Sequence, residues 1–290
     1  MKGLKNSPAL RLRAVLASMG LASALSGCAP EIVLPVTISA TDRLAAEMAD
    51  PGGIYDEPVA LRSPGWETTR CAAVTIADGV EADVYWPSGD VENALPVVVL
   101  LCGDRDTYVK ATGRPYRRYV PVVSWAADIA SRGMAVVVPD VVSKMDGIKA
   151  VLDWIDWKGL GFGLDSHRMA FFGFGPEAAS IPYVLHLDGA QYVRTVAVFY
   201  GGFQTAYYVF PSGVAFRLVG TGDPDDPSGV SGEMDQLVRQ LQVGGNEVDH
   251  VVRPELGAYF DWIAVEGTPG ADAAREVLAS TLDFFESRLR

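Results

Sequence analysis

The stretch Arg168-Met-Ala-Phe-Phe-Gly-Phe-Gly-Pro-Glu-Ala-Ala-Ser180 decides the fold of this 290-residue chain. Its apolar first half predicts a strand that is buried on both faces. The glycines that follow allow a sharp turn, and Pro176 suits the first turn of a helix. The stretch therefore predicts a central strand, a tight turn and a helix rich in small residues.

The chain around this stretch alternates strands with helices. Apolar, β-branched runs predict strands at 71–77, 80–86, 96–102, 134–138, 169–173, 195–200, 214–219 and 248–252. Helical spacing of apolar residues predicts helices at 120–131, 145–157, 231–243 and from 272 onward. Asp78-Gly79 favours a hairpin between the first two strands. We expect an α/β fold, with a doubly wound, mostly parallel sheet that an N-terminal antiparallel hairpin opens.

The first 27 residues have the features of an export signal. Basic residues precede the apolar segment Ala14 to Leu25, which is too short to span a bilayer. The segment ends in Leu25-Ser-Gly-Cys28, which resembles the lipobox of bacterial lipoproteins. This resemblance implies that Cys28 is acylated and anchors an exported protein in the envelope, and Ala29 favours the outer membrane. An ordinary secretory signal and a cytosolic protein with an apolar start are the alternatives.

Residues 28–70 are expected to form a tether and an N-terminal wrap, and residues 71–290 a single domain. Without the signal, 20 Lys and Arg oppose 36 Asp and Glu, a formal charge of −16. That charge repels phosphate backbones and argues against a nucleic-acid partner. In an oxidising compartment Cys71 and Cys102 are allowed to form a disulfide, and two buried thiols are the alternative.

Three features in order resemble the α/β-hydrolase superfamily, especially its esterase and dienelactone-hydrolase-like members. The glycine turn follows the third parallel strand, Gly220-Thr-Gly-Asp223-Pro follows a later strand, and Phe260-Asp-Trp262 comes near the end. The resemblance covers residues 71–290. It implies a nucleophile in the pattern G-x-S-x-G, a histidine base, an acid, and two N–H donors for an oxyanion.

The catalytic positions depart from that pattern. The frame reads Gly173-Phe-Gly-Pro-Glu177, so Gly175 stands where the nucleophile belongs and Pro176 has no N–H to donate. The negative charge of Glu177 would oppose an oxyanion. Counting back from Phe260, the position of the base holds Ala258. Asp223 matches the position of the triad acid; the alternative is that it only caps the turn formed by Gly222-Asp223-Pro224.

The remaining candidates lie in loops after strands. Gly103 is kept where the family shows His-Gly, but Cys102 replaces the histidine. The three histidines, His167, His186 and His250, are not placed for a triad by their position in the chain. A ligand pocket is predicted at Gly103, Asp104, Phe203, Tyr207 and Tyr208, with Phe210 beside them; the alternative is that these aromatic residues pack the edge of the core.

These observations favour a catalytically degenerate envelope lipoprotein that binds a small molecule or an envelope protein, without a cofactor or a metal. The first alternative is an ester hydrolase with a relocated nucleophile, Cys102. The second is a module that binds a divalent cation through loop aspartates at positions 104, 106, 140, 223, 225 and 226.

Overall fold

The computed structural model describes residues 69–77, 79–88, 93–101, 117, 120–140, 145–201, 209–222, 232–257, 260–263 and 270–290. The chain divides into two units, Met1–Ile32 and Val33–Arg290, and every described residue belongs to the second. The export signal, Cys28 and the tether lie outside the described residues. No helix in the described ranges is long and apolar enough to cross a membrane.

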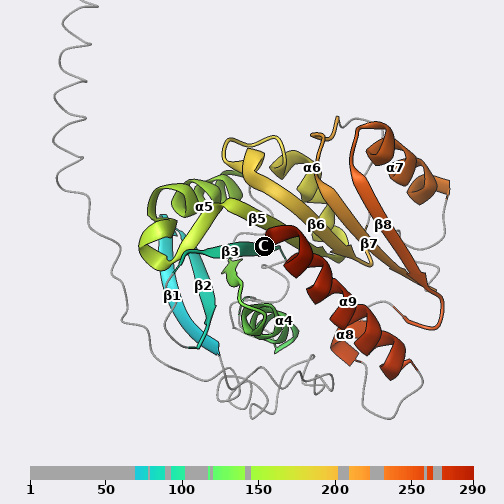
Figure 1. Ribbon diagram of the computed structural model, residues 1–290, viewed down its shortest axis with the longest axis horizontal. Helices are drawn as coiled ribbons and strands as arrows, with labels where there is room; N and C mark the ends of the chain where they lie inside the picture. Colours follow the sequence, from blue (N-terminus) through green and yellow to red (C-terminus); the bar gives the residue numbers. More distant parts are fainter. Residues whose placement is uncertain are drawn as a thin grey trace, which may run out of the picture. The chain divides into compact units, whose positions relative to one another are not determined.

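Eight strands of the described chain form one sheet in the order β1-β2-β4-β3-β5-β6-β7-β8 (Figure 1). They are β1 (Thr69–Ala77), β2 (Val80–Pro87), β3 (Leu95–Leu101), β4 (Ala135–Pro139), β5 (Leu164–Phe174), β6 (Val193–Phe199), β7 (Ala215–Thr221) and β8 (Glu247–Arg253). The hairpin of β1 and β2 is antiparallel, and so is the pair β2 and β4; all the other pairs are parallel. The predicted fold class is confirmed.

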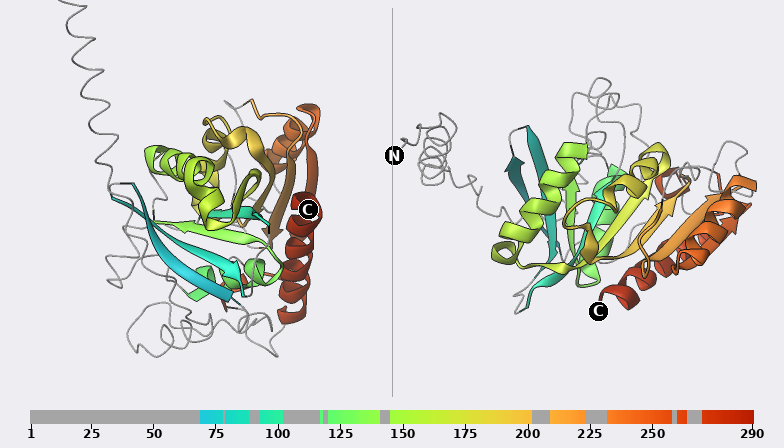
Figure 2. Two further views of the ribbon diagram at one scale, coloured as in Figure 1. Left: turned by 60° about the vertical axis from the view of Figure 1, so that its left-hand side comes forward. Right: turned by 90° about the horizontal axis from the view of Figure 1, so that it is seen from above.

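Helices cover both faces of the sheet, as Figure 2 shows. One face packs against α4 (Val120–Ser131), α8 (Phe260–Ile263) and α9 (Ala271–Leu289). The other packs against α5 (Met145–Lys158), α6 (Ile181–Val184) and α7 (Gly232–Val243). Alternation along β5 supplies both cores, because Phe172 faces α4 and α9 whereas Phe171 faces α5.

Three short 3₁₀ segments complete the described chain: η3 (Gly159–Phe162), η4 (Gly175–Ser180) and η5 (Ala190–Tyr192). The prediction of an α-helix directly after the glycine turn is wrong, since η4 comes first and α6 has only four residues. Pro182 gives the reason. Inside a continuous α-helix its ring would clash with the carbonyl group of Ala178, and it has no N–H to donate.

β5 also begins earlier than its apolar run predicts. The strand starts at Leu164, and its first residues pair with Leu95 and Pro96 before the register shifts. Asp165, Ser166, His167 and Arg168 make this part polar, so its sequence does not have the pattern of a buried strand.

The sheet order bears on the proposed disulfide. Cys71 is buried on β1, and three strand spacings, roughly 14 Å, separate β1 from β3, which ends at Leu101. Cys102 lies outside the described residues, but one residue extends a chain by only about 3.8 Å, and a disulfide needs Cα atoms within about 7 Å.

We therefore predict that Cys71 and Cys102 do not form a disulfide with each other. Alkylation of the denatured protein without a reductant should modify both thiols, as judged by peptide mass spectrometry. The Cys102→Ser variant is the control, in which Cys71 should be alkylated to the same extent as in the wild type. A peptide pair joined through the two sulfur atoms would contradict the prediction.

Candidate functional site

A sharp turn joins β5 to η4 at Gly175. Phe174 has extended backbone angles, with φ −126° and ψ 139°, and Gly175 then has φ +55°. A residue with a side chain rarely adopts such a φ, and glycine adopts it without a steric cost. In an α/β-hydrolase the nucleophile stands on a strained turn of this kind, after the central strand. Gly175 has the position but brings no reactive group.

Two other glycines allow the turn to pack closely. A Cβ atom on Gly201 would lie 2.4 Å from the carbonyl oxygen of Gly175 and 2.8 Å from the Cβ of Ala178. A Cβ on Gly173 would lie 2.8 Å from Cδ1 of Ile181. The chain after β6 therefore approaches the backbone of the turn at a distance that only glycine permits, whereas a Cβ on Gly173 would displace the end of the Ile181 side chain on α6.

One of the N–H donors that an oxyanion would need is absent from the turn. Pro176 is the residue after Gly175, and its nitrogen carries no hydrogen. The side chains of Pro176 and Glu177 lie outside what the structure describes. Gly103 and Asp104, which belong to the loop of the second donor, also lie outside the described residues.

The acid and base positions cannot be placed. β7 ends at Thr221 and β8 at Arg253, while Asp223 and Ala258 lie outside the described residues. The same holds for the predicted pocket residues Phe203, Tyr207 and Tyr208. Phe210 is described, and it packs in the core with its ring centroid 6.0 Å from that of Phe216.

The histidines lie away from the turn. His167 is exposed near the start of β5, roughly 25 Å along the strand from Gly175. His250 lies on β8 opposite Leu218, three strands from β5 and so roughly 14 Å away. His186 follows α6 on the flank of the sheet, where its N–H donates to the carbonyl of Tyr183.

A buried polar network that the sequence does not predict lies beside the turn. Asp261 on α8 accepts a hydrogen bond from Trp125 Nε1 at 2.7 Å and another from the Tyr200 hydroxyl at 2.8 Å. Tyr200 directly precedes Gly201 and has φ +38°, the one positive φ among the described non-glycine residues. The network thus joins α4, the end of β6 and α8 beside the turn at Gly175, which is called the elbow below.

Burial controls the charge of this carboxyl group. Desolvation raises the pKa of Asp261 to about 6, although its two hydrogen bonds to Trp125 and Tyr200 act in the opposite direction. Its donor Trp125 packs among aromatic rings, with edge contacts to Phe172 and Phe199 at centroid distances of 4.7 and 5.4 Å. In the sequence, Phe260-Asp-Trp262 served only to locate the position of the base. The sequence did not predict that Asp261 is a buried carboxylic acid.

Asp140, one of the predicted cation ligands, has a protein partner. The buried Arg117 donates to Asp140 at 2.7 Å and to Glu81 at 2.6 Å, and its Nε lies 3.4 Å from an Asp83 oxygen. The other five candidate aspartates lie outside the described residues. Within the described ranges no group of three carboxylate, imidazole or thiol side chains could hold a metal ion.

We predict that Asp261 makes stability depend on pH. Its folded pKa, about 6, lies above the usual 3.8, so its contribution to stability is largest below pH 3.8 and is lost as pH rises to about 6. In Asp261→Asn the amide cannot ionise, while its oxygen can accept from Trp125 and its nitrogen can donate to Tyr200. The free energy of unfolding of the variant, relative to that of the wild type, should therefore increase by about 2 to 3 kcal/mol when the pH is raised from 4 to 7.

Urea denaturation at several pH values measures this difference, and a difference that is constant with pH would contradict it. Tyr200→Phe serves as a control that keeps the ionisable group; because the lost hydrogen bond lowers the pKa of Asp261, the pH dependence of this variant should be at least as large as that of the wild type.

The chain matches no protein-family model and no curated protein sequence, but many solved structures share its fold. EstE1, a thermophilic carboxylesterase cloned from a metagenomic library, is 16% identical over 87% of this chain and 95% of its own, with a TM-score of 0.56. Brefeldin A esterase, a bacterial homologue of human hormone sensitive lipase, is 19% identical over 98% and 94%, with a TM-score of 0.57. The sugar hydrolase YeeB from Lactococcus lactis is 9% identical over 75% and 97%, with a TM-score of 0.56. Likeness at such identities concerns the fold, and the chain has the fold of the α/β-hydrolase superfamily.

Proposed function

We propose that the protein is a catalytically degenerate α/β-hydrolase-fold lipoprotein, which acts in the bacterial envelope as a binding or structural module. Its partner is a small molecule or an envelope protein. One observation carries the proposal: the residue at the sharp turn after β5 is Gly175, which has no side chain to act as a nucleophile.

The neighbouring positions support the same conclusion. Acyl transfer on this fold needs a nucleophile, a base that takes its proton, and N–H groups that stabilise the oxyanion. Pro176 removes one N–H donor, and loss of one such donor typically costs about a hundredfold to a thousandfold in rate. Ala258 stands at the position of the base. Three independent losses make residual acyl transfer by the usual route negligible.

A second candidate is ester hydrolysis with a relocated nucleophile. It is favoured by two structural neighbours that are esterases, a carboxylesterase and brefeldin A esterase. Cys102 is the available nucleophile in the loop after β3. Asp104 and Asp106 follow it closely, and nearby negative charges raise the pKa of a thiol, which disfavours the reactive thiolate.

A cation-binding module is weaker still. Asp140 is bound by Arg117, whose positive charge opposes a metal ion at the same carboxylate.

We predict that the purified protein does not hydrolyse short-chain aryl esters above the rate of an Asp223→Ala variant prepared in parallel. The variant removes the one retained triad position, so it reports any contaminating esterase. Equal rates in a spectrophotometric assay are the expected result.

A wild-type rate that exceeds that of Asp223→Ala would overturn the degenerate assignment. The Cys102→Ser variant would then test the relocated nucleophile, since only that hypothesis requires the excess rate to vanish with the thiol.

Anchoring to the envelope gives a separate prediction. We expect the full chain, expressed in a bacterium that makes lipoproteins, to incorporate a labelled fatty acid and to fractionate with membranes. Cys28→Ala should lose the label completely, whereas Cys71→Ala should keep it. An unlabelled wild-type protein released from the envelope would show that the signal is an ordinary secretory one.

A further inference from the structure

The edge of the sheet where the parallel strands begin is also the edge where the chain enters the domain. Tyr85 pairs with Val136 near the start of β4, and Ala82 pairs with Pro139 at its end. Pro87, beyond Tyr85, therefore lies at the strand-start edge, and Thr69 at the beginning of β1 is its partner. The described chain thus begins at this edge, at Thr69, opposite to the edge that carries Gly175.

Two large apolar side chains project into solvent at the same edge. Trp157, at the end of α5, is 86% exposed, and Leu160, in η3, is 78% exposed. Their backbone is held firmly, because Trp86 Nε1 donates to the carbonyl of Phe162 at 2.8 Å and Trp154 contacts the Phe162 ring at a centroid distance of 4.9 Å. Trp86 is the partner of Arg70 on β1, so this exposed pair lies near the entry of the chain.

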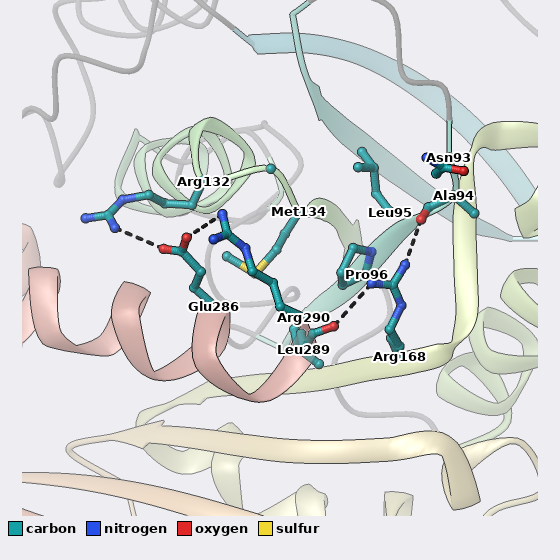
Figure 3. A pocket seen from close by; sticks show the side chains of 11 residues that line it. Asn93, Ala94, Leu95, Pro96, Arg132, Met134, Arg168, Glu286, Leu289 and Arg290 are labelled. Atoms are coloured by element: carbon teal, nitrogen blue, oxygen red, sulfur yellow. Dashed lines mark hydrogen bonds and ion pairs between the residues drawn. The ribbon is translucent and has the colours of Figure 1, made fainter.

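A pocket with three arginines lies at the same edge of the sheet. Its cavity has a volume of about 340 Å³, and Figure 3 shows Arg132, Arg168, Arg290 and Glu286 in its lining. Leu95 also lines this cavity, and its N–H donates to the carbonyl of Gly163, the residue after η3, at 2.8 Å. The arginine pocket and the exposed pair therefore share the strand-start edge.

Two of these arginines, Arg132 and Arg290, have guanidinium nitrogens that make no described contact. Arg168 is held at all three nitrogens, by Asp165 at 2.6 Å, the carbonyl of Ala94 at 2.8 Å and the carbonyl of Leu289 at 3.4 Å. Arg132 uses only Nη1, on Asp283 and Glu286, and Arg290 uses only Nη2, on Glu286. Guanidinium groups present a planar fork of donors that fits phosphate oxygens.

We propose that this strand-start edge docks on a phospholipid bilayer. Trp157 and Leu160 enter the interfacial region, and the arginine pocket binds lipid phosphate groups. The proposal rests on the lipid anchoring proposed above, which tethers the domain to a membrane through a segment that enters at this edge. Tryptophan suits the membrane interface because one end of its ring system is polar and the rest apolar.

The net charge of the chain does not oppose this contact at close range. Without the export signal the formal charge is −16, but at physiological ionic strength charges are screened beyond about 8 Å. Within that range the three arginines stand beside Asp165, Asp283 and Glu286. The unused guanidinium N–H groups of the pocket, and not a net positive charge, are therefore what would bind a phosphate.

The test uses the full chain reconstituted into phosphatidylcholine–phosphatidylglycerol vesicles, with and without lipids brominated in the upper part of the acyl chain. Bromine quenches tryptophan fluorescence only at contact. We expect wild-type fluorescence to be quenched, and Trp157→Phe to lose most of that quenching. Trp154→Phe, a buried residue of the same helix, is the matched control and should keep it.

A second pair of variants tests the pocket. Arg132→Gln combined with Arg290→Gln should lower the quenching at least twofold, whereas Arg239→Gln, an exposed arginine of α7, should leave it unchanged. Equal quenching in the double variant would overturn the role of the pocket.

Mass spectrometry of Cys28 in the same samples separates the two proposals. An acylated protein without Trp157-dependent quenching overturns docking and leaves anchoring intact. An unacylated protein with such quenching supports docking and overturns anchoring, and the absence of both overturns both. If Trp157 becomes protected as protein concentration rises without lipid, a second copy of the chain covers this edge, and bilayer docking is overturned.

Discussion

The close approach of the chain after β6 to the turn after β5 is the constraint on which the elbow depends. A Cβ at Gly201 would lie 2.4 Å from the Gly175 carbonyl oxygen, so the two turns fit together only as bare backbone. The same approach fixes Tyr200, which holds φ +38° against its own preference. Its hydroxyl bond to Asp261 supplies part of the compensation. The turn therefore keeps a demanding geometry although Gly175, the residue at its tip, has no side chain.

Buried charged groups join the layers of this fold at several points, and they differ in whether their partners are neutral or charged. Asp261 has only neutral donors, so desolvation dominates and raises its pKa. Arg217 on β7 has both an ionic partner, Asp249, and hydroxyl partners on α9, Thr281 at 2.9 Å and Ser280 at 2.6 Å. Burying a charge without partners carries a large desolvation penalty, and each of these groups has partners from other elements that reduce it. These groups specify which helix meets which strand, a selectivity that the apolar core alone provides less well.

The sequence predicts those parts of the structure that local patterns determine. β3 and β4 are runs of valine and leucine buried on both faces, and their positions are right within a residue or two. The turn at Gly175 is equally local, since glycine and proline set its backbone. The Asp261 network was not predicted, because Trp125 lies 136 residues and Tyr200 61 residues from it in sequence. The polar start of β5 was missed for a related reason: its pairing with β3, and not its own pattern, makes it a strand.

Parallel strands give the two edges of this sheet different chemical roles. Loops that follow strands gather at one edge, which is where such folds bind ligands and where Gly175 stands. Connections that lead into strands gather at the other, where Thr69, the end of α5 and the arginine pocket lie. The stretch of β3 from Leu95 to Leu101, which pairs with β5 from Leu164 to Gly173, separates the two edges by roughly 20 Å. A domain that docks through its strand-start edge would therefore hold the elbow away from the bilayer, open to soluble ligands or to an envelope partner. Because the proposed contact surface and the turn at Gly175 share no residue, the proposed docking does not depend on whether that turn supports catalysis.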